Sequence, residues 1–295
     1  MQRADERAFK AKLLLFGEYT IIEGSQALAV PQARYFGEWA WAKKEDRAAL
    51  QQELPQFAAW LKEKSEVIDS QRFQQDLAQG LYFKSNIPTG YGLGSSGALV
   101  AALYARYGVP EKHKSLSELK EILAALEGFF HASSSGIDPF ISYLDCPVLR
   151  TESGALEALP TLDWPEGFRF FLIDTGKPRK TGPLVQSFLE RCESADYLEF
   201  IRTTLKPLVG QAIQAFLKGD WLQLWTSTGE ISRLQLLHFQ KMIPAAFLPI
   251  WENSLHSDSF RIKLCGAGGG GFLLGLCREH LTPDDLGIPH WEWVA

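Results

Sequence analysis

Short apolar runs and longer segments of helical spacing both occur along the chain, which predicts a protein with strands and helices. The strand-like runs cover 9–22, 81–83, 168–173, 261–265 and 272–277. The first run is rich in Leu, Ile, Phe and Tyr, is interrupted at Gly17-Glu18, and ends at the turn-forming pair Gly24-Ser25. The last two runs flank a stretch of glycines.

Apolar residues recur every three or four positions in five segments, which are 48–77, 98–107, 115–130, 184–197 and 200–217. The clearest helix is 115–130, where Ser115 followed by Glu118 is a capping-box pattern. Helices and strands do not alternate regularly, so the expected fold class is α+β. The stretch at 150–165, which contains Pro160 and Trp164-Pro165, is the predicted boundary between two lobes.

Composition and charge narrow the classes of function. The 295 residues are 46% hydrophobic and 22% charged, which is typical of a folded globular protein. A formal charge of -5 argues against nucleic acid as a partner. No apolar run has the length of a membrane span, and the charged start of the chain lacks a signal-peptide core. The four cysteines show no CxxC pair and no metal-ligand spacing, so we expect reduced thiols and a cytoplasmic protein.

The segment 87–97, Ile-Pro-Thr-Gly-Tyr-Gly-Leu-Gly-Ser-Ser-Gly, carries the strongest functional pattern. Glycines let backbone N–H groups crowd around an anion, and a helix that begins after them presents its positive end to the same anion. Ser95 and Ser96 add hydroxyls that can reach a phosphate or its Mg²⁺. The alternative is a glycine-rich turn without a ligand. The pattern favours a phosphate-binding loop.

Other nucleotide-binding patterns are excluded by their context. The loops at Gly92–Gly97 and Gly266–Gly271 both satisfy GxGxxG, but a dinucleotide fingerprint requires a strand directly before the glycines and a helix directly after. The first loop is separated from its strand, and the second is followed by another strand-like run. No Walker motif and no protein-kinase HRD or DFG motif occurs.

Two carboxylates lie around a loop of small residues, Glu127 and Asp138. Phosphoryl transfer requires Mg²⁺ ligands, cations, and a carboxylate that orients or deprotonates the acceptor hydroxyl. Glu127 lies at the edge of an apolar stripe, where periodicity allows either a cleft carboxylate or a solvated one. For Asp138 the alternative is a helix N-cap or turn aspartate. His131, between the two carboxylates, is by itself more often a hydrogen-bonded structural histidine than a catalyst.

Two basic features of the sequence are further candidates for the functional site. Lys12 lies within an apolar run, where a cation is costly unless it is paired, so it is either an edge-strand lysine or a cation near a transferred phosphate. The loop Thr175–Thr181 contains Lys177 and Arg179, which are suited to an acidic substrate or phosphate, although a solvated charge cluster is the alternative.

Taken together, these segments resemble the GHMP kinase superfamily, and most closely its mevalonate kinase branch. Lys12–Tyr19 with its continuation to Pro31, Pro88–Ser96, and Lys263–Gly271 resemble the three family motifs in the right order. The spacing from Glu127 through His131 to Asp138 is similar to that of mevalonate kinases.

The resemblance implies a two-lobed α+β fold, with an N-terminal ATP-binding lobe like ribosomal protein S5 domain 2 at 1–160 and a ferredoxin-like lobe at 161–295. It implies an ATP-dependent kinase that phosphorylates an alcohol, mevalonate first, with ATP and Mg²⁺ and no nucleic acid or membrane partner. Asp138 would be the base, Lys12 its cationic neighbour, and Ser96 and Glu127 the Mg²⁺ ligands. The remaining implied contacts are nucleotide binding by Pro88, Gly90, Gly92, Leu93, Gly94, Ser95, Ser96, Gly97, Gly266, Ala267, Gly268 and Gly269, and substrate binding by Glu18, Tyr19, Ser135, Lys177 and Arg179.

Departures from the family pattern concern the acceptor. Mevalonate kinases carry histidine at the position of Tyr19, whereas phosphomevalonate kinases tend to have tyrosine there. The paired glycines expected beyond Asp138 are replaced by Leu144–Pro147. Phosphomevalonate, another small alcohol or a sugar therefore remain alternative acceptors. A non-catalytic paralogue that binds nucleotide is an alternative of another class, and the sequence leaves monomer and homodimer open.

Overall fold

The chain forms two compact units in a computed structural model that describes residues 7–64, 66–109, 115–131 and 134–294. Unit 1 comprises residues 1–12, 31–88 and 93–146, and unit 2 comprises 13–30, 89–92 and 147–295. The chain therefore crosses between the units several times, and two strands contribute residues to both. The domain limits 1–160 and 161–295 remain a prediction.

The first sheet is built on two long strands, β1 (Phe9–Phe16) and β2 (Ala27–Trp41). The strands follow the order β1-β2-β4-β5, and β3 (Leu81–Ser85) also pairs with β2. Within unit 1, the second half of β2 pairs antiparallel with β3, with Trp39 opposite Phe83. Within unit 2, the first half of β2 pairs with β4 (Val148–Arg150), which pairs with β5 (Leu156–Ala158). Buried and half-buried residues alternate along β1, as expected for a strand with one face on the core.

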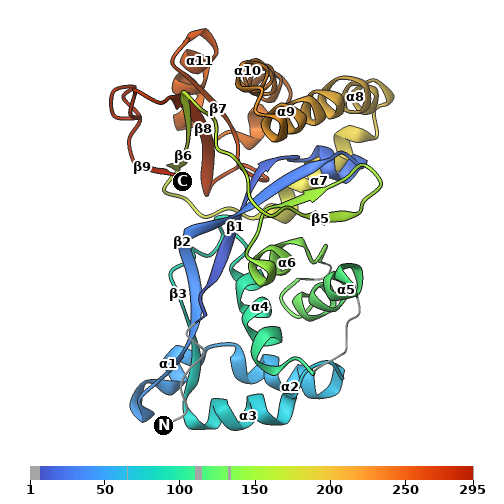
Figure 1. Ribbon diagram of the computed structural model, residues 1–295, viewed down its shortest axis with the longest axis vertical. Helices are drawn as coiled ribbons and strands as arrows, with labels where there is room; N and C mark the ends of the chain where they lie inside the picture. Colours follow the sequence, from blue (N-terminus) through green and yellow to red (C-terminus); the bar gives the residue numbers. More distant parts are fainter. Residues whose placement is uncertain (1–6, 65, 110–114, 132–133, 295) are drawn as a thin grey trace. The chain divides into compact units, whose positions relative to one another are not determined.

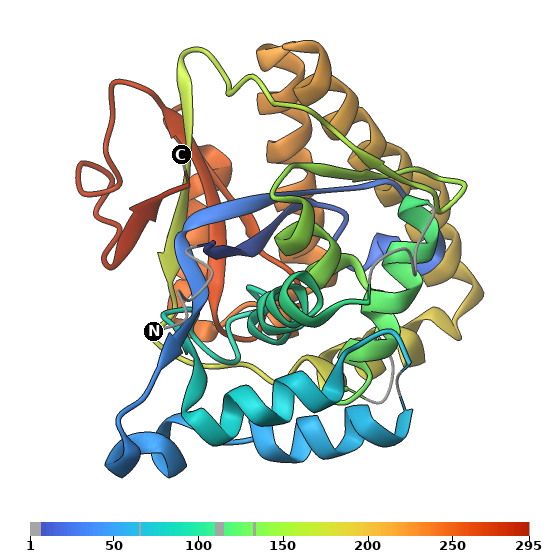
Figure 2. The ribbon, with the colours of Figure 1, turned by 60° about the horizontal axis from the view of Figure 1, so that its bottom comes forward.

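Among the described residues of unit 1, the α-helices are α1 (Arg47–Gln51), α2 (Leu54–Lys64), α3 (Ser70–Gln79), α4 (Ser95–Tyr107), α5 (Leu116–Glu127) and α6 (Ile137–Leu144). Helix α4 packs against α5 and α6 (Figure 1), and α2 and α3 run side by side (Figure 2). Helix α4 is rich in alanine and nearly every residue from Gly97 to Tyr104 is buried, which allows these close helix contacts.

The second sheet lies within unit 2 and has the antiparallel order β7-β8-β6-β9. Its strands are β6 (Phe168–Asp174), β7 (Phe260–Leu264), β8 (Phe272–Arg278) and β9 (Trp291–Trp293). Strand β6 pairs with β8 from Phe168 opposite Arg278 to Asp174 opposite Phe272. The near-continuous apolar sequences of β6 and β8 fit their burial on both faces.

The helices of unit 2 are η1 (Thr20–Glu23), α7 (Thr181–Cys192), α8 (Ala195–Phe200), α9 (Lys206–Lys218), α10 (Trp221–His238), η4 (Gln240–Met242), η5 (Ala245–Phe247) and α11 (Leu248–His256). A π-helical turn, η3 (Ile201–Leu205), joins α8 to α9. Helices α9 and α10 lie side by side, and α10 and α11 pack on β7 (Figure 1). Buried side chains of these helices and of the second sheet, with Phe171, Phe188 and Trp251 among the largest, form a hydrophobic core in unit 2.

The structure differs from the predicted elements mainly at their interruptions. The segment 48–77, predicted to be helical, is divided among α1, α2 and most of α3, and Asp69 caps α3 by accepting from the backbone of Arg72. The predicted strand 9–22 ends at Phe16, since residues 20–23 form η1. A short 3₁₀ helix, η2 (Lys44–Asp46), precedes α1. No helix in the described part of the chain has both the length and the apolar character needed to cross a bilayer.

Candidate functional site

Two lysines on β1 pair with two aspartates at opposite ends of α6, all within unit 1. Lys12 Nζ lies 3.0 Å from Asp138 Oδ1, at the start of the helix. Lys10 Nζ lies 2.9 Å from Asp145 Oδ1, just past its end. Because strand side chains two positions apart share a face, β1 presents both ammonium groups to the same helix. The sequence-predicted neighbours Lys12 and Asp138 are thus brought together.

Asp138 lies in the first turn of α6, where the helix dipole favours a negative charge. Gly136 precedes the helix with φ +72°, a conformation that glycine adopts without strain. The start of α4 approaches closely: a Cβ at Gly97 would lie 2.8 Å from the Asp138 carbonyl carbon, and one at Gly94 would lie 3.0 Å from Asp138 Oδ2. These two glycines of the predicted phosphate loop therefore also make room for the aspartate.

Glu127 is the last residue of α5 and is almost fully buried, with an exposed fraction of 4%. Ser96 Oγ donates to Glu127 Oε1 at 2.9 Å, and Ser134 Oγ donates to Oε2. His131 Nε2 lies 3.1 Å from Ser96 Oγ. Burial raises the pKa of Glu127, and the negative charge of Asp138 raises it further, whereas the two serine hydroxyls oppose the rise.

The set around Glu127 fits a hard cation held by few protein ligands. Its oxygens are a carboxylate and hydroxyls, which Mg²⁺ prefers, and no lysine or arginine among the described residues forms an ion pair with this buried carboxylate. Within the described residues, no group of three or more His, Cys, Asp or Glu side chains is arranged to hold a metal. A Mg²⁺ ion here would therefore take most of its ligands from phosphate and water, as is usual for this ion.

A second group of predicted residues lies in unit 2, around the Gly266–Gly271 loop. The hydroxyl of Tyr19 donates to the Ala267 carbonyl at 2.6 Å, and its ring packs against Phe188 and Phe239. Burial raises the pKa of Tyr19, and the positive charge of Arg179 opposes the rise. Arg179 Nη1 donates to the Cys265 carbonyl at 2.7 Å.

Glu18 forms a buried ion pair with Lys263 in unit 2. The Lys263 ammonium donates to a Glu18 carboxylate oxygen and to the carbonyls of Leu15 and Leu264, at 2.9 and 2.8 Å. Burial raises the pKa of Glu18, while the charge of Lys263 and its hydrogen bond oppose the rise. Each of the three groups that Lys263 contacts belongs to a segment that resembles a family motif.

The predicted site residues thus fall into two sets, each ordered within its own unit. Unit 1 holds Lys12, Pro88, Leu93, Gly94, Ser95, Ser96, Gly97, Glu127, Ser135 and Asp138, and unit 2 holds Glu18, Tyr19, Gly90, Gly92, Lys177, Arg179, Gly266, Ala267, Gly268 and Gly269. Two residues that the sequence prediction did not assign take part: Ser134, which binds Glu127, and Lys263. The three serines that follow His131 were the available indication for Ser134.

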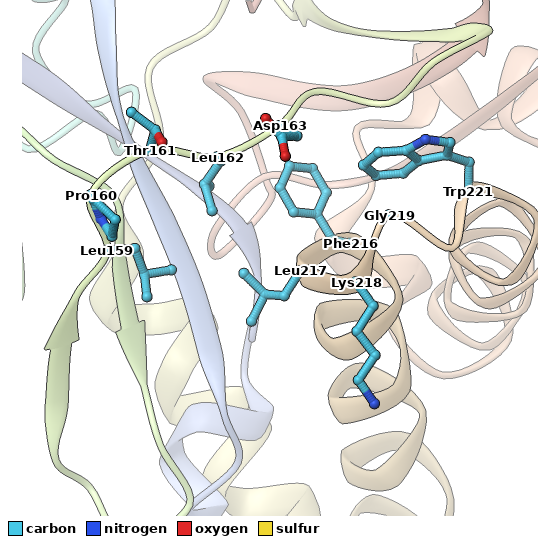
Figure 3. Close-up of a pocket in the computed structure, with 10 residues that line it drawn as sticks. All are labelled: Leu159, Pro160, Thr161, Leu162, Asp163, Phe216, Leu217, Lys218, Gly219 and Trp221. Atoms are coloured by element: carbon cyan, nitrogen blue, oxygen red, sulfur yellow. The ribbon is translucent and has the colours of Figure 1, made fainter.

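A separate cavity of about 240 Å³ lies in unit 2, between the segment 159–163 and the end of α9 (Figure 3). Leu159, Pro160 and Leu162 line one side, and Phe216, Leu217 and Trp221 the other. None of the residues predicted to form the site lines this cavity.

Part of the chain matches a known protein family, and the whole chain has curated relatives. Residues 58–145 match the family described as "GHMP kinases N terminal domain". The chain is 27% identical to the mevalonate kinase of Pyrococcus horikoshii, in an alignment that covers 95% of this chain and 92% of that protein.

Solved structures share the fold. The structure of L. major mevalonate kinase in complex with R-mevalonate has a TM-score of 0.68 at 15% identity, covering 99% of this chain and 98% of that one. Streptococcus pneumoniae phosphomevalonate kinase in complex with phosphomevalonate and AMPPNP has a TM-score of 0.66 at 17% identity, covering 97% and 99%. The α+β fold predicted from the resemblance to the GHMP kinases is confirmed.

Proposed function

We propose that this chain, which has the GHMP kinase fold, is an ATP-dependent kinase that transfers the γ-phosphoryl group to the hydroxyl of a small alcohol, with mevalonate as the acceptor. The observation that carries the proposal is the pairing of Lys12 with Asp138 at the start of α6, beside the buried Glu127 and Ser96. The curated relatives named mevalonate kinase support the choice of acceptor.

Asp138 acts as the base in this proposal. Its Oδ1 is paired with Lys12, which leaves Oδ2 to accept the proton of the acceptor hydroxyl. The hydroxyl oxygen bonds to the γ-phosphorus as the bond from that phosphorus to the β,γ-bridging oxygen breaks, and ADP leaves with that oxygen. The ion pair with Lys12 fixes the direction of the carboxylate, which lies in the first turn of α6. Lys12 supplies positive charge next to the oxygen that attacks.

Ser96 and Glu127 would hold Mg²⁺ through the Ser96 hydroxyl and the Glu127 carboxylate. When bound, the ion neutralises charge on the phosphate oxygens of ATP. Ser134 keeps the Glu127 carboxylate oriented by donating to its second oxygen. The buried position of Glu127 excludes water from the carboxylate, which strengthens its interaction with a cation.

The glycine loop 90–97 supplies backbone N–H groups to the phosphates in this proposal. Gly90, Gly92 and Gly94 have φ values of +79°, +75° and +72°, which turn successive N–H groups in a way that suits an anion. Ser95 begins α4, so the unpaired N–H groups of the first helical turn follow directly. The N–H of Lys12 donates to the Leu93 carbonyl at 2.9 Å, which fastens the loop to β1.

The substitution Asp138→Asn tests the chemistry. It keeps the shape of the side chain but removes its basicity, so kcat for ADP release with mevalonate is expected to fall about 10²–10⁴-fold, while ATP binding measured by calorimetry changes little. Asp145→Asn is the matched control, because Asp145 pairs with the neighbouring lysine at the other end of α6 and is expected to leave kcat unchanged. Equal turnover by Asp138→Asn and the wild type would remove Asp138 from the mechanism.

Phosphomevalonate is a second candidate acceptor. Tyr19, the exposed Lys177 of the basic loop, and the fold shared with the S. pneumoniae phosphomevalonate kinase favour it. Comparing kcat/KM for mevalonate and phosphomevalonate decides between the two. Tight ATP binding without ADP release for either acceptor, or for other small alcohols and sugars, would instead indicate a nucleotide-binding paralogue without activity.

A further inference from the structure

Arg179 lies in the loop between β6 and α7 and contacts two glycine loops of unit 2. Its backbone N–H donates to the Gly90 carbonyl at 2.8 Å, and its Nη1 donates to the Cys265 carbonyl at 2.7 Å. One residue therefore binds the backbone of the second motif and of the third. Two separate groups of Arg179, the main chain and the guanidinium, make these two contacts.

The guanidinium also fills the space in front of two glycines. A Cβ at Gly92 would lie 1.6 Å from Arg179 Nη2, and a Cβ at Gly266 would lie 2.5 Å from the same atom. No side chain larger than hydrogen fits at either position while the arginine keeps its place. Gly92 and Gly266 thus leave room for the Arg179 guanidinium, because neither residue has a side chain.

The glycine loops also touch each other directly beside this arginine. A Cβ at Gly271 would lie 2.7 Å from the Tyr91 carbonyl, and the ring of Tyr91 lies 5.2 Å from that of Phe272. The Gly271 N–H donates to the Lys177 carbonyl at 2.7 Å, two residues before Arg179. The three segments 90–92, 177–179 and 265–271 therefore form one packed backbone cluster.

These contacts argue against a role for Arg179 in binding the acceptor. Arg179 Nε is buried and has no hydrogen-bond partner among the described residues, and Nη1 is used by the Cys265 carbonyl. Nη2 faces Gly92 and Gly266. A guanidinium that binds a substrate carboxylate or phosphate usually presents two donors side by side, and here those donors face backbone.

We propose that Arg179 is a positioning residue that holds the Gly90–Gly92 part of the phosphate loop against the Cys265–Gly271 loop, and that its main effect is on nucleotide affinity rather than on acceptor recognition. This inference rests on the proposed function, since it assigns the phosphates to the loop at 90–97. Arg179 raises affinity by keeping the loop N–H groups in their binding arrangement before ATP arrives.

The test compares Arg179→Gln and Arg179→Lys with Lys180→Gln, which removes a charge from an exposed side chain of the same loop. The first measurement is amide hydrogen exchange in the protein without ligand. Both Arg179 variants are expected to exchange faster in peptides covering 88–94 and 263–272, with strand β6 unchanged as a check on the fold. Lys180→Gln is expected to match the wild type.

The second measurement is binding and kinetics. The dissociation constant for ATP without acceptor is expected to rise about tenfold to a hundredfold in Arg179→Gln, the range expected for a lost charge-assisted hydrogen bond, while KM for the acceptor changes little. Arg179→Lys is expected to recover little of this affinity, because an ammonium group cannot donate to Cys265 and also fill the space before both glycines.

The outcomes separate this inference from the proposed function. A rise in the acceptor KM alone, with wild-type exchange in both loops, would make Arg179 a substrate contact and overturn the inference. Full recovery of ATP affinity in Arg179→Lys would also overturn it, because charge alone would then suffice. Failure of the wild type to bind ATP would reject the proposed function itself.

Discussion

At the scale of single residues, the most demanding interaction is the buried ion pair of Glu18 and Lys263. The side chains have exposed fractions of 2% and 1%, so neither charge is stabilised by water. Three acceptors surround the Lys263 ammonium, which compensates for its burial. Removing one partner from such a pair leaves an uncompensated charge in the interior.

Lys263→Met is therefore expected to lower the free energy of unfolding by about 3–5 kcal/mol near pH 8. Burial already raises the pKa of Glu18 above its ordinary 4.5, and the pKa rises further without the lysine. A raised pKa means that the folded state takes up a proton more readily than the unfolded state, so stability falls as pH rises through the interval between the two pKa values. The destabilisation measured by urea unfolding should thus be smaller at pH 5 than at pH 8.

The double variant Glu18→Gln with Lys263→Met is the control for this interpretation. It removes both charges, so it should be more stable than Lys263→Met at pH 8 and should lack its pH dependence. A Lys263→Met variant with the same loss of stability at both pH values would show that Glu18 is not the group responsible.

Residue by residue, the sequence located the candidate site better than it predicted the environment of each side chain. Periodicity left Glu127 equally compatible with solvent and with a cleft, and the structure buries it beside Ser96. Lys12 was open between an edge-strand lysine and a cation near a transferred phosphate; it lies on β1, at the end of the strand order, and its ammonium group is paired with Asp138. Both ambiguities have the same physical cause, since local spacing fixes the face of an element but not what packs against that face.

At the scale of elements, helix α5 begins as its sequence predicts. Ser115 accepts from the Glu118 backbone and Glu118 accepts from the Ser115 backbone, which completes the capping box. The four unpaired N–H groups at a helix start make such caps valuable. This helix carries Glu127 at its other end, so its stability supports the candidate site.

Ser115→Ala is expected to lower the free energy of unfolding by about 1 kcal/mol, because the Glu118 N–H loses its acceptor. Ser117→Ala is the matched control, since Ser117 is an exposed residue inside the same helix, where alanine is the better helix former. Urea unfolding of the two variants measures the difference. Equal stability of both variants would mean that the capping box contributes nothing.

Both sheets place a phenylalanine ring over a strand glycine. A Cβ at Gly275 of β8 would lie 2.1 Å from the Phe171 ring of β6, and a Cβ at Gly37 of β2 would lie 2.2 Å from the Phe83 ring of β3. Phe171 and Gly275 are directly opposite in the register. The glycine lets the ring lie flat across the neighbouring strand, which the sequence pattern of β8 does not reveal.

Gly275→Ala is expected to destabilise the protein by about 1–3 kcal/mol, because the new methyl group displaces the buried Phe171 ring. Gly182→Ala in the first turn of α7 is the control, since nothing lies within 4 Å of its Cβ position. That variant should be neutral or slightly more stable, as alanine restricts the unfolded chain. Thermal unfolding of both proteins tests the contrast, and an unaffected Gly275→Ala would mean that the ring moves without loss of packing.

At the scale of the whole molecule, the chain order does not follow the compact units. The residues 13–30 and 89–92 belong to unit 2 although they lie within the first third of the sequence. The predicted phosphate loop is consequently divided, with Gly90 and Gly92 in unit 2 and Leu93 to Gly97 in unit 1. A linear search for a domain boundary cannot find such a division, because a composition shift marks where a linker lies and not which residues pack together.

The sequence by itself determined the fold class, the glycine loops, the cap of α5, and the identity of Lys12, Glu127 and Asp138 as candidates. These features depend on local chemistry: backbone freedom at glycine, side-chain caps, and residue types suited to phosphoryl transfer. Tertiary structure alone decided that Arg179 lies against Gly92 and Gly266, that Lys263 neutralises Glu18, and that Gly97 makes room for Asp138. Those contacts join residues from 41 to 245 positions apart, and only packing of the folded chain brings such residues within reach.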